Sequence, residues 1–168
     1  MAGTQFVAHP FGPLWDARSR VLILGTMPSP ASRRASFYYA HPQNRFWPAL
    51  CAALGERDPG DNAARRALAL RRRVALWDVL ARCEIAGASD ASIRGAVPND
   101  LTPILAGADI TTIFTTGKKS YELYKKYIEP ITGRPAVCLP SPSPANCAVH
   151  FDALVAAYGA VAAALATE

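Results

Sequence analysis

The sequence predicts a three-layer α/β/α sandwich around a central, mainly parallel sheet, and three observations lead to this fold class. Short apolar runs alternate with longer segments of helical character, as in chains that build a parallel sheet covered on both sides. The chain has 168 residues, of which 51% are hydrophobic, and this is enough for one domain with a sizeable core. No internal repeat interrupts the alternation. We therefore expect a single domain over residues 1–168.

Four runs are predicted as strands. The first is continuously apolar and ends in a glycine, which is typical of a strand buried on both faces. The others are apolar or β-branched and are bounded by turn residues. The four runs are residues 21–24, 74–79, 111–116 and 136–139. Residues 1–20 and 87–98 are rich in small and turn-forming residues, so we expect an irregular lead-in and a long connection there.

The segments between these strands are predicted as helices. Asp61 or Asn62 can cap a helix that runs through residues 63–73, and Asn99 or Asp100 can cap a short helix that ends near residue 105. Further helices are expected at 45–54, at 118–128 and at the C-terminal end. The last helix is indicated by apolar residues at the helical period: Phe151, Leu154, Val155, Tyr158, Val161 and Leu165.

The charge balance favours an anionic partner such as nucleic acid. Lys and Arg number 18 against 13 Asp and Glu, for a net charge of +5. This excess is modest and is weak evidence by itself. No apolar stretch is long enough for a membrane span, and the N-terminal residues lack the pattern of a secretion signal. We expect a soluble, cytoplasmic monomer that does not contact a membrane.

The cysteines do not indicate a metal or a disulfide framework. Cys51, Cys83, Cys138 and Cys147 are widely spaced and form no C-x-x-C pair. We expect them to be buried as small apolar residues. No cofactor and no metal are expected.

Two loops should lie at the same edge of the predicted sheet. Residues 25–30 and residues 140–146 each follow a strand, and the carboxyl ends of parallel strands form the ligand-binding edge of such a sheet. The aromatic segment 37–47 follows the first loop. A planar, polar ring is a natural ligand for this combination.

These segments resemble the uracil-DNA glycosylase superfamily, and within it the hypoxanthine-DNA (deoxyinosine) glycosylases. The resemblance rests on Ala40-His41-Pro42-x-Asn44-Arg45-Phe46-Trp47 and on the Pro-Ser-Pro of the second loop, although Leu139 stands where a His often precedes that motif. It extends to Leu76-Trp77-Asp78-Val79 and Gly117-Lys118-Lys119. It implies the superfamily fold and a metal-independent hydrolysis of an N-glycosidic bond in DNA.

The first loop departs from the related mismatch-specific uracil glycosylases. They have Gly-x-Asn-Pro where this chain has Gly25-Thr26-Met27-Pro28, so the water-orienting carboxamide is absent. The resemblance implies that Asn44 takes over as the catalytic residue, by orienting a water or contacting the base. Without the resemblance, a cap on the following helix is the more economical interpretation of Asn44. Asp78, at the end of a predicted strand, is an alternative water-activating group.

The resemblance also implies the remaining roles. Tyr39 should stack on the base, a contact worth about 1–3 kcal/mol. The other base-binding candidates are Gly25, Thr26, Met27, Pro28 and His41. The DNA-binding candidates are Ser29, Ser141, Pro142, Ser143, Asn146 and Lys118; small hydroxyl residues beside prolines suit phosphate contacts.

The expected function is a monofunctional DNA glycosylase that removes hypoxanthine from double-stranded DNA and thereby starts base excision repair. Extrusion of the damaged base from the duplex is part of this expectation. A uracil or G:T/U mismatch glycosylase is the enzymatic alternative. A nonenzymatic protein that binds nucleic acid or a nucleotide on the same fold is the alternative of a different class.

Overall fold

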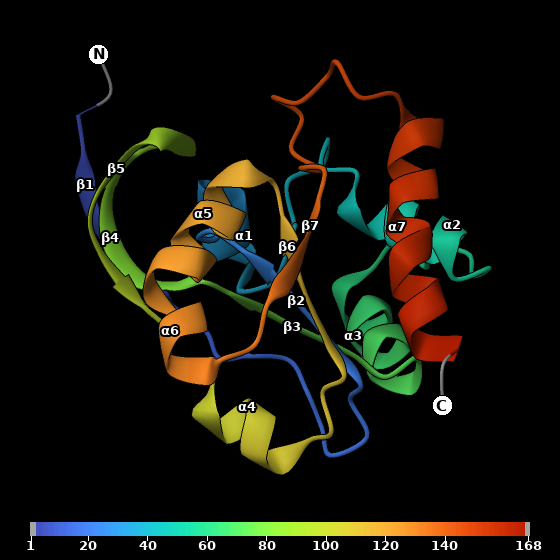
Figure 1. The fold of residues 1–168 in the computed structure, drawn as a ribbon. Helices are drawn as coiled ribbons and strands as arrows, with labels where there is room; N and C mark the ends of the chain where they lie inside the picture. The colour runs from blue at the N-terminus through green and yellow to red at the C-terminus, as the bar shows by residue number, and fades with distance from the viewer. Residues whose placement is uncertain (1–2, 167–168) are drawn as a thin grey trace.

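The computed structural model describes residues 3–166, which form two sheets and seven helices (Figure 1). The larger sheet has the strand order β3-β2-β6-β7, and every neighbouring pair in it is parallel. Its strands are β2 (Val21–Gly25), β3 (Val74–Asp78), β6 (Thr112–Thr116) and β7 (Ala136–Leu139). The predicted α/β class with a mainly parallel sheet is confirmed.

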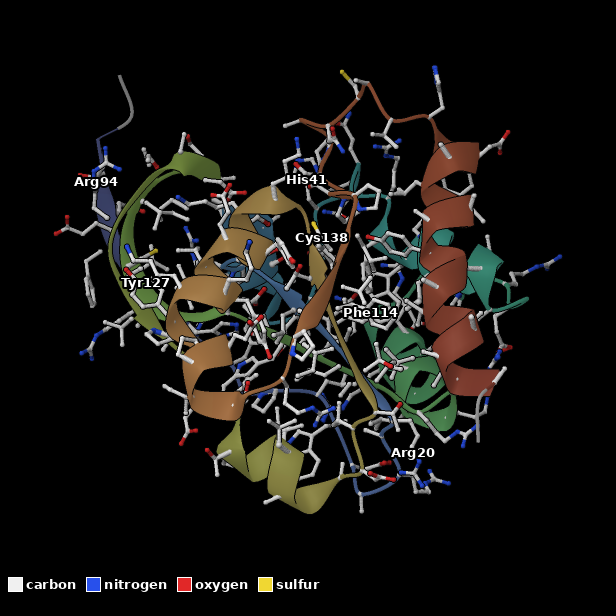
Figure 2. All side chains as sticks on the ribbon, viewed as in Figure 1. Arg20, His41, Arg94, Phe114, Tyr127 and Cys138 are labelled. Atoms are coloured by element: carbon white, nitrogen blue, oxygen red, sulfur yellow. The ribbon has the colours of Figure 1, made fainter. Side chains whose placement is uncertain are left out.

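Helices cover both faces of this sheet. On one face lie α2 (Phe46–Ala53), α3 (Asn62–Arg71) and the long α7 (Phe151–Ala166). Phe114 of β6 is buried among their apolar side chains and is labelled in the interior beside α7 in Figure 2. The other face packs against α4 (Thr102–Gly107) and α5 (Lys118–Tyr127), with the short α6 (Glu129–Thr132) following α5.

The second sheet corrects two sequence-based expectations. The lead-in contains β1 (Gln5–Ala8), and the expected connection after residue 86 is the ten-residue β5 (Ser89–Pro98). Both strands pair antiparallel with β4 (Leu80–Ala86), which continues from β3 after a single residue. Only one residue of β1 and one of β5 are buried, so neither strand carries an apolar signal in the sequence.

The helix caps follow the local chemistry. The side chain of Asp61 accepts a hydrogen bond from Ala64 N at 2.8 Å, as expected of an N-cap. Asp100 Oδ1 accepts from Thr102 N at 2.9 Å before α4. A further helix, α1 (Pro30–Ala35), lies where only a loop was expected. Its N-cap is Ser29, and Pro30 occupies the first helical position.

The cysteine expectation is half right. Cys51 and Cys83 are buried, but Cys138 and Cys147 are exposed. Cys138 lies on β7, the edge strand of the parallel sheet, and Cys147 lies in the loop that follows it. Among residues 3–166 no helix has the length and apolarity to cross a membrane, and no group of His, Cys, Asp or Glu is arranged to hold a metal ion.

Candidate active site

A pocket opens at the carboxyl edge of the parallel sheet, where the two predicted loops meet. Its cavity volume is about 120 Å³, and its mouth is open to solvent. Its lining residues come from β2 and its loop, α1, the aromatic segment, β3, the β4–β5 hairpin, β6 and the loop after β7. They are Gly25, Thr26, Met27, Pro28, Ser29, Ser32, Tyr38, Tyr39, Asn44, Asp78, Ile85, Ala88, Asp90, Thr116, Ser141, Pro142 and Ser143.

Gly25 makes a close approach of polar groups possible at the floor of the pocket. It lies opposite Asp78 in the β2–β3 register. A Cβ added to Gly25 would lie 2.5 Å from Asp78 Oδ1, 3.2 Å from the Tyr39 hydroxyl and 3.6 Å from Thr116 Oγ1. The missing side chain therefore leaves three polar side chains grouped around the end of β2.

Tyr39 is held in one orientation by contacts on its ring and hydroxyl. Its φ of 53° is in the left-handed region, which is uncommon for an aromatic residue. One ring face stacks on Phe46 with centroids 3.8 Å apart, and the hydroxyl lies 3.1 Å from Thr116 Oγ1. Burial raises the pKa of Tyr39 well above its usual value, and Asp78 raises it further. The hydroxyl therefore stays protonated, and Phe46 covers one face of the ring.

The carboxamide of Asn44 caps a helix and also lines the pocket. Its Oδ1 accepts a hydrogen bond from Phe46 N at 2.9 Å, at the start of α2. This bond assigns the oxygen and nitrogen of the amide. Its Nδ2 has no hydrogen-bond partner among residues 3–166. The capping interpretation and a pocket role are thus compatible, because each uses a different atom of the same amide.

The serines of the two loops use their oxygens to hold the backbone. Ser29 Oγ accepts from Ser32 N, and Ser141 Oγ accepts from Ser143 N, each at 3.2 Å. Ser143 Oγ in turn accepts from Ala145 N at 3.2 Å. All three serines line the pocket. Local turns therefore fix their side-chain oxygens.

Three of the predicted site residues do not line the pocket. His41 Nδ1 accepts from Gln43 N within its own loop, at the same end of the molecule as the loop after β7 (Figure 2). Asn146 donates from Nδ2 to Ser141 O at 2.9 Å and so braces the second loop. Lys118 is exposed at the first turn of α5. Their predicted contacts with a base or with DNA remain predictions.

Arg45 joins the aromatic segment to the second loop. Its backbone N–H donates to Pro142 O at 3.1 Å, and its guanidinium donates to Val149 O at 2.5 Å and to Asn146 O at 3.0 Å. These bonds link segments that are about a hundred residues apart in the chain. They hold Asn44 next to the Ser141–Ser143 turn.

Two groups that sequence reasoning did not place in the site are His9 and Asp90. His9 Nε2 lies 2.7 Å from Asp78 Oδ2, and both side chains are buried, with 4% and 5% exposure. The carboxylate accepts, so Nε2–H donates. Asp90 reaches the pocket from β5, a strand without a sequence signal. The one cue in the sequence was Asp78 at a predicted strand end, and it carried no information about a partner 69 residues away.

The fold and the pocket define an α/β protein whose ligand site lies at the carboxyl ends of parallel strands. Comparison with known proteins identifies the family. The chain belongs to the Uracil DNA glycosylase superfamily, whose family model matches residues 12–160. Membership in this superfamily supports the assignment of the protein as a DNA glycosylase, which is an enzyme that acts on DNA.

Two relatives come from the genus Methanosarcina. A protein of Methanosarcina barkeri named hypoxanthine DNA glycosylase is 34% identical over 114 residues, which cover 67% of this chain and 72% of the relative. A Methanosarcina acetivorans protein of the same name is 30% identical over 138 residues, 81% of this chain and 86% of the relative.

A solved structure shows the same fold. It is a solution NMR structure of a candidate uracil DNA glycosylase from Methanosarcina acetivorans, with a TM-score of 0.78 and 26% identity. The match covers 94% of this chain and 99% of that one. The resemblance to the uracil-DNA glycosylase superfamily drawn from the sequence is thereby confirmed.

Proposed function

We propose that this protein is a monofunctional DNA glycosylase that hydrolyses the N-glycosidic bond of deoxyinosine in duplex DNA. The reaction releases hypoxanthine, leaves an abasic site and starts base excision repair. The observation that carries the proposal is the Asn44 carboxamide, which lines the pocket while Met27 occupies the loop position of a water-orienting amide. The names of the two relatives support hypoxanthine as the base.

The proposed reaction places the extruded base in the pocket at the sheet edge. The base stacks on the open face of Tyr39, whose other face is supported by Phe46. As the C1′–N9 bond breaks, its electron pair goes to the base, and the sugar becomes an oxocarbenium-like electrophile. A water oxygen then bonds to C1′ and loses one proton, and the departing base gains one.

Asn44 can assist this reaction through either of two atoms. Its Nδ2 can donate to an acceptor on the base and so stabilise the negative charge that develops there. Alternatively, the second lone pair of Oδ1 can orient the water while the first remains bonded to Phe46 N. An amide is a poor base, but an oxocarbenium-like sugar requires little activation of the nucleophile.

The loops after β2 and β7 are proposed to hold the DNA strand beside the extruded nucleotide. Ser29, Ser141 and Ser143 line the pocket, and local hydrogen bonds fix their side chains. The Ser29 hydroxyl donates to Ser32 Oγ at 3.3 Å, whereas the hydroxyls of Ser141 and Ser143 each have a proton to donate to an acceptor such as a phosphate oxygen. Lys118, exposed near the same edge, supplies positive charge to this surface.

The test is excision from labelled duplexes that carry one deoxyinosine or one deoxyuridine opposite each normal base. Abasic sites are read as alkali-labile cleavage, and DNA binding is read by fluorescence anisotropy. We expect cleavage at deoxyinosine, and we expect Asn44→Ala to lose most of it while it still binds the duplex. Cleavage at deoxyuridine alone would reassign the protein to a uracil glycosylase. Binding without any cleavage would favour the nonenzymatic alternative.

Asn44→Asp separates the capping role from the chemical role. A carboxylate keeps the acceptor for Phe46 N and suits a helix N-terminus, but it removes the N–H donor. Loss of excision in a stably folded Asn44→Asp variant assigns the chemistry to Nδ2, and retained excision assigns it to the oxygen and the water. Asn62→Ala, at the start of α3 and outside the pocket lining, is the matched control.

A further inference from the structure

All four lysines of the chain lie on one helix. They are Lys118, Lys119, Lys125 and Lys126 of α5, and the other basic residues, His aside, are arginines. With four lysines and one acidic residue, Glu122, the ten-residue helix has a formal net charge of +3. The reaction as proposed above uses only Lys118, so three of these charges have no role in it.

The fold does not use the charges of these lysines. Arginines of α3 form ion pairs with Asp58 and Glu56, and the guanidinium of Arg45 joins two loops. Among residues 3–166, by contrast, no lysine forms an ion pair or donates a hydrogen bond from its ammonium group. Two of the ammonium groups lie over tyrosine rings of the same helix, 4.7 and 5.0 Å from the ring centroids. The four charges are therefore available to a partner outside the chain.

The first turn of α5 lies beside the loop that is proposed to hold DNA. Gly117, which precedes the helix, donates its N–H to Leu139 O at 2.7 Å, and a Cβ added to it would lie 3.2 Å from Ser141 Cβ. Burial raises the pKa of Asp90 in the pocket lining, and the charge of Lys119 opposes this from beyond ion-pair distance. The helix thus begins at the pocket edge, and Figure 1 shows it running from there to α6.

The lysines form two rows along one side of α5. Lys118 and Lys125 are seven residues apart, as are Lys119 and Lys126, so each pair lies nearly in line after two helical turns. Lys119 is half-buried, and the other three are exposed. At a rise of 1.5 Å per residue, the second pair lies about 10 Å further along the helix than the first. We call these two rows the lysine face.

The first lysine pair is placed where it weakens the helix itself. A helix N-terminus carries partial positive charge, and α5 has neither an acidic residue in its first turn nor a side-chain N-cap. Lys118 and Lys119 therefore add like charge to the positive end of the helix. An anion bound beside them would offset this repulsion, which favours a negatively charged partner.

We infer that the lysine face of α5 binds the phosphate backbone of the duplex on one flank of the damaged nucleotide. An ammonium group binds phosphate as a flexible point charge. Successive phosphates of one strand are about 3.4 Å apart along the duplex axis, so the second pair reaches about three nucleotides beyond the first. Phosphate contacts carry no sequence information, and undamaged duplex is therefore bound as well. This inference rests on the proposed function in taking DNA as the partner.

The first test measures how DNA binding depends on salt. Each neutralised phosphate contributes about 0.9 to the slope of log affinity against log salt concentration. We expect Lys125→Gln/Lys126→Gln to reduce that slope by about 2, so between about 50 and 200 mM salt the unaltered protein loses about 10-fold more affinity than the variant. Binding is read by fluorescence anisotropy with a deoxyinosine duplex and with an undamaged duplex. An unchanged slope would overturn the inference and would point to an acidic protein segment as the partner.

Two matched variants separate a local contact from a general loss of charge. Arg18→Gln/Arg57→Gln removes the same charge from exposed residues outside α5, and we expect it to leave the slope nearly unchanged. Lys125→Arg/Lys126→Arg keeps the charge and should restore the slope. An equal reduction by the variant outside α5 would show that net charge determines the binding, and the inference would then be wrong. Thermal unfolding checks that each variant is folded.

The second test asks whether the contact lies on one flank. The duplex is shortened on either side of the deoxyinosine while the opposite side stays long, and the effect of Lys125→Gln/Lys126→Gln is measured on each. We expect the effect to vanish when one particular side is cut to about two nucleotides and to persist when the other side is cut. The same effect on every duplex would contradict the inference, because it would indicate a diffuse field rather than a contact.

Failure of this inference can be distinguished from failure of the proposed function. If DNA is bound with the expected salt slopes and no base is excised, the proposed function falls and the inference stands. If deoxyinosine is excised and the slope of the α5 variant is unchanged, the function stands and the inference falls. If the protein binds no DNA, both fall.

Discussion

Gly25→Ala places a methyl group in the most crowded part of the pocket. The new Cβ would lie 2.5 Å from Asp78 Oδ1, well inside the 3.4 Å at which ordinary contact begins, and 3.2 Å from the Tyr39 hydroxyl. Gly25 itself is not at a positive φ, so the backbone accepts alanine. Either Asp78 or the end of β2 must therefore move by about 1 Å, and a shift of this size in a catalytic site can cost about 100-fold in rate.

We expect Gly25→Ala to fold and to excise hypoxanthine about 100-fold more slowly than the unaltered protein. The assay is single-turnover cleavage of a deoxyinosine duplex, with thermal unfolding measured alongside. Gly12→Ala is the control, because nothing lies within 4 Å of its added Cβ. Normal excision by a folded Gly25→Ala variant would show that the Asp78 and Tyr39 positions described here are not needed for the reaction.

Three further predictions concern stability and reactivity. Gly159→Ala in α7, where the added Cβ meets nothing within 4 Å, should raise the free energy of unfolding by about 1 kcal/mol in urea titrations without altering excision. The hydrogen bonds from Arg65 hold the pKa of Asp58 below its usual range, so their stabilisation is present above the unfolded-state pKa of about 4 and is lost as the pH falls through the folded value. Asp58→Asn should therefore cost about 0.5–1 kcal/mol at pH 7, and a cost that persists in acid would refute this. Cys138 and Cys147 should react rapidly with a thiol reagent, whereas the two buried thiols should react only on unfolding; slow reaction of all four would contradict the exposure described.

The parts of the fold that sequence reasoning found are those with a dense apolar signal. The run 21–24 has four apolar residues in succession, and every residue of β2 is buried. By contrast, β5 buries only Ile93 among its ten residues. Its place is set by pairing with β4 rather than by a core, so its sequence resembles a loop. The same reason hides β1, in which only Val7 is buried.

The sequence predicts those parts of the site that lie at the carboxyl ends of the parallel strands. The rule that parallel strands end at one edge brought the loop after Gly25 and the loop around Ser141 together, and both line the pocket. It also placed Asp78 at that edge. No such rule connects Asp78 with His9, because their contact depends on β1, a strand without a periodic signal.

The two oxygens of Asp78 show why this missing partner matters for function. A lone buried carboxylate at a strand end can accept a proton, activate a water or bind a base, and its sequence position does not distinguish these roles. The bond from His9 Nε2 occupies Oδ2 and leaves Oδ1 beside Gly25, in the wall of the pocket. The carboxylate then has a fixed direction, and its Oδ1 accepts no hydrogen bond from the described residues 3–166. The direction of this carboxylate thus depends on a histidine just after the first strand, whereas the proposed chemistry depends on Asn44, which caps the start of α2.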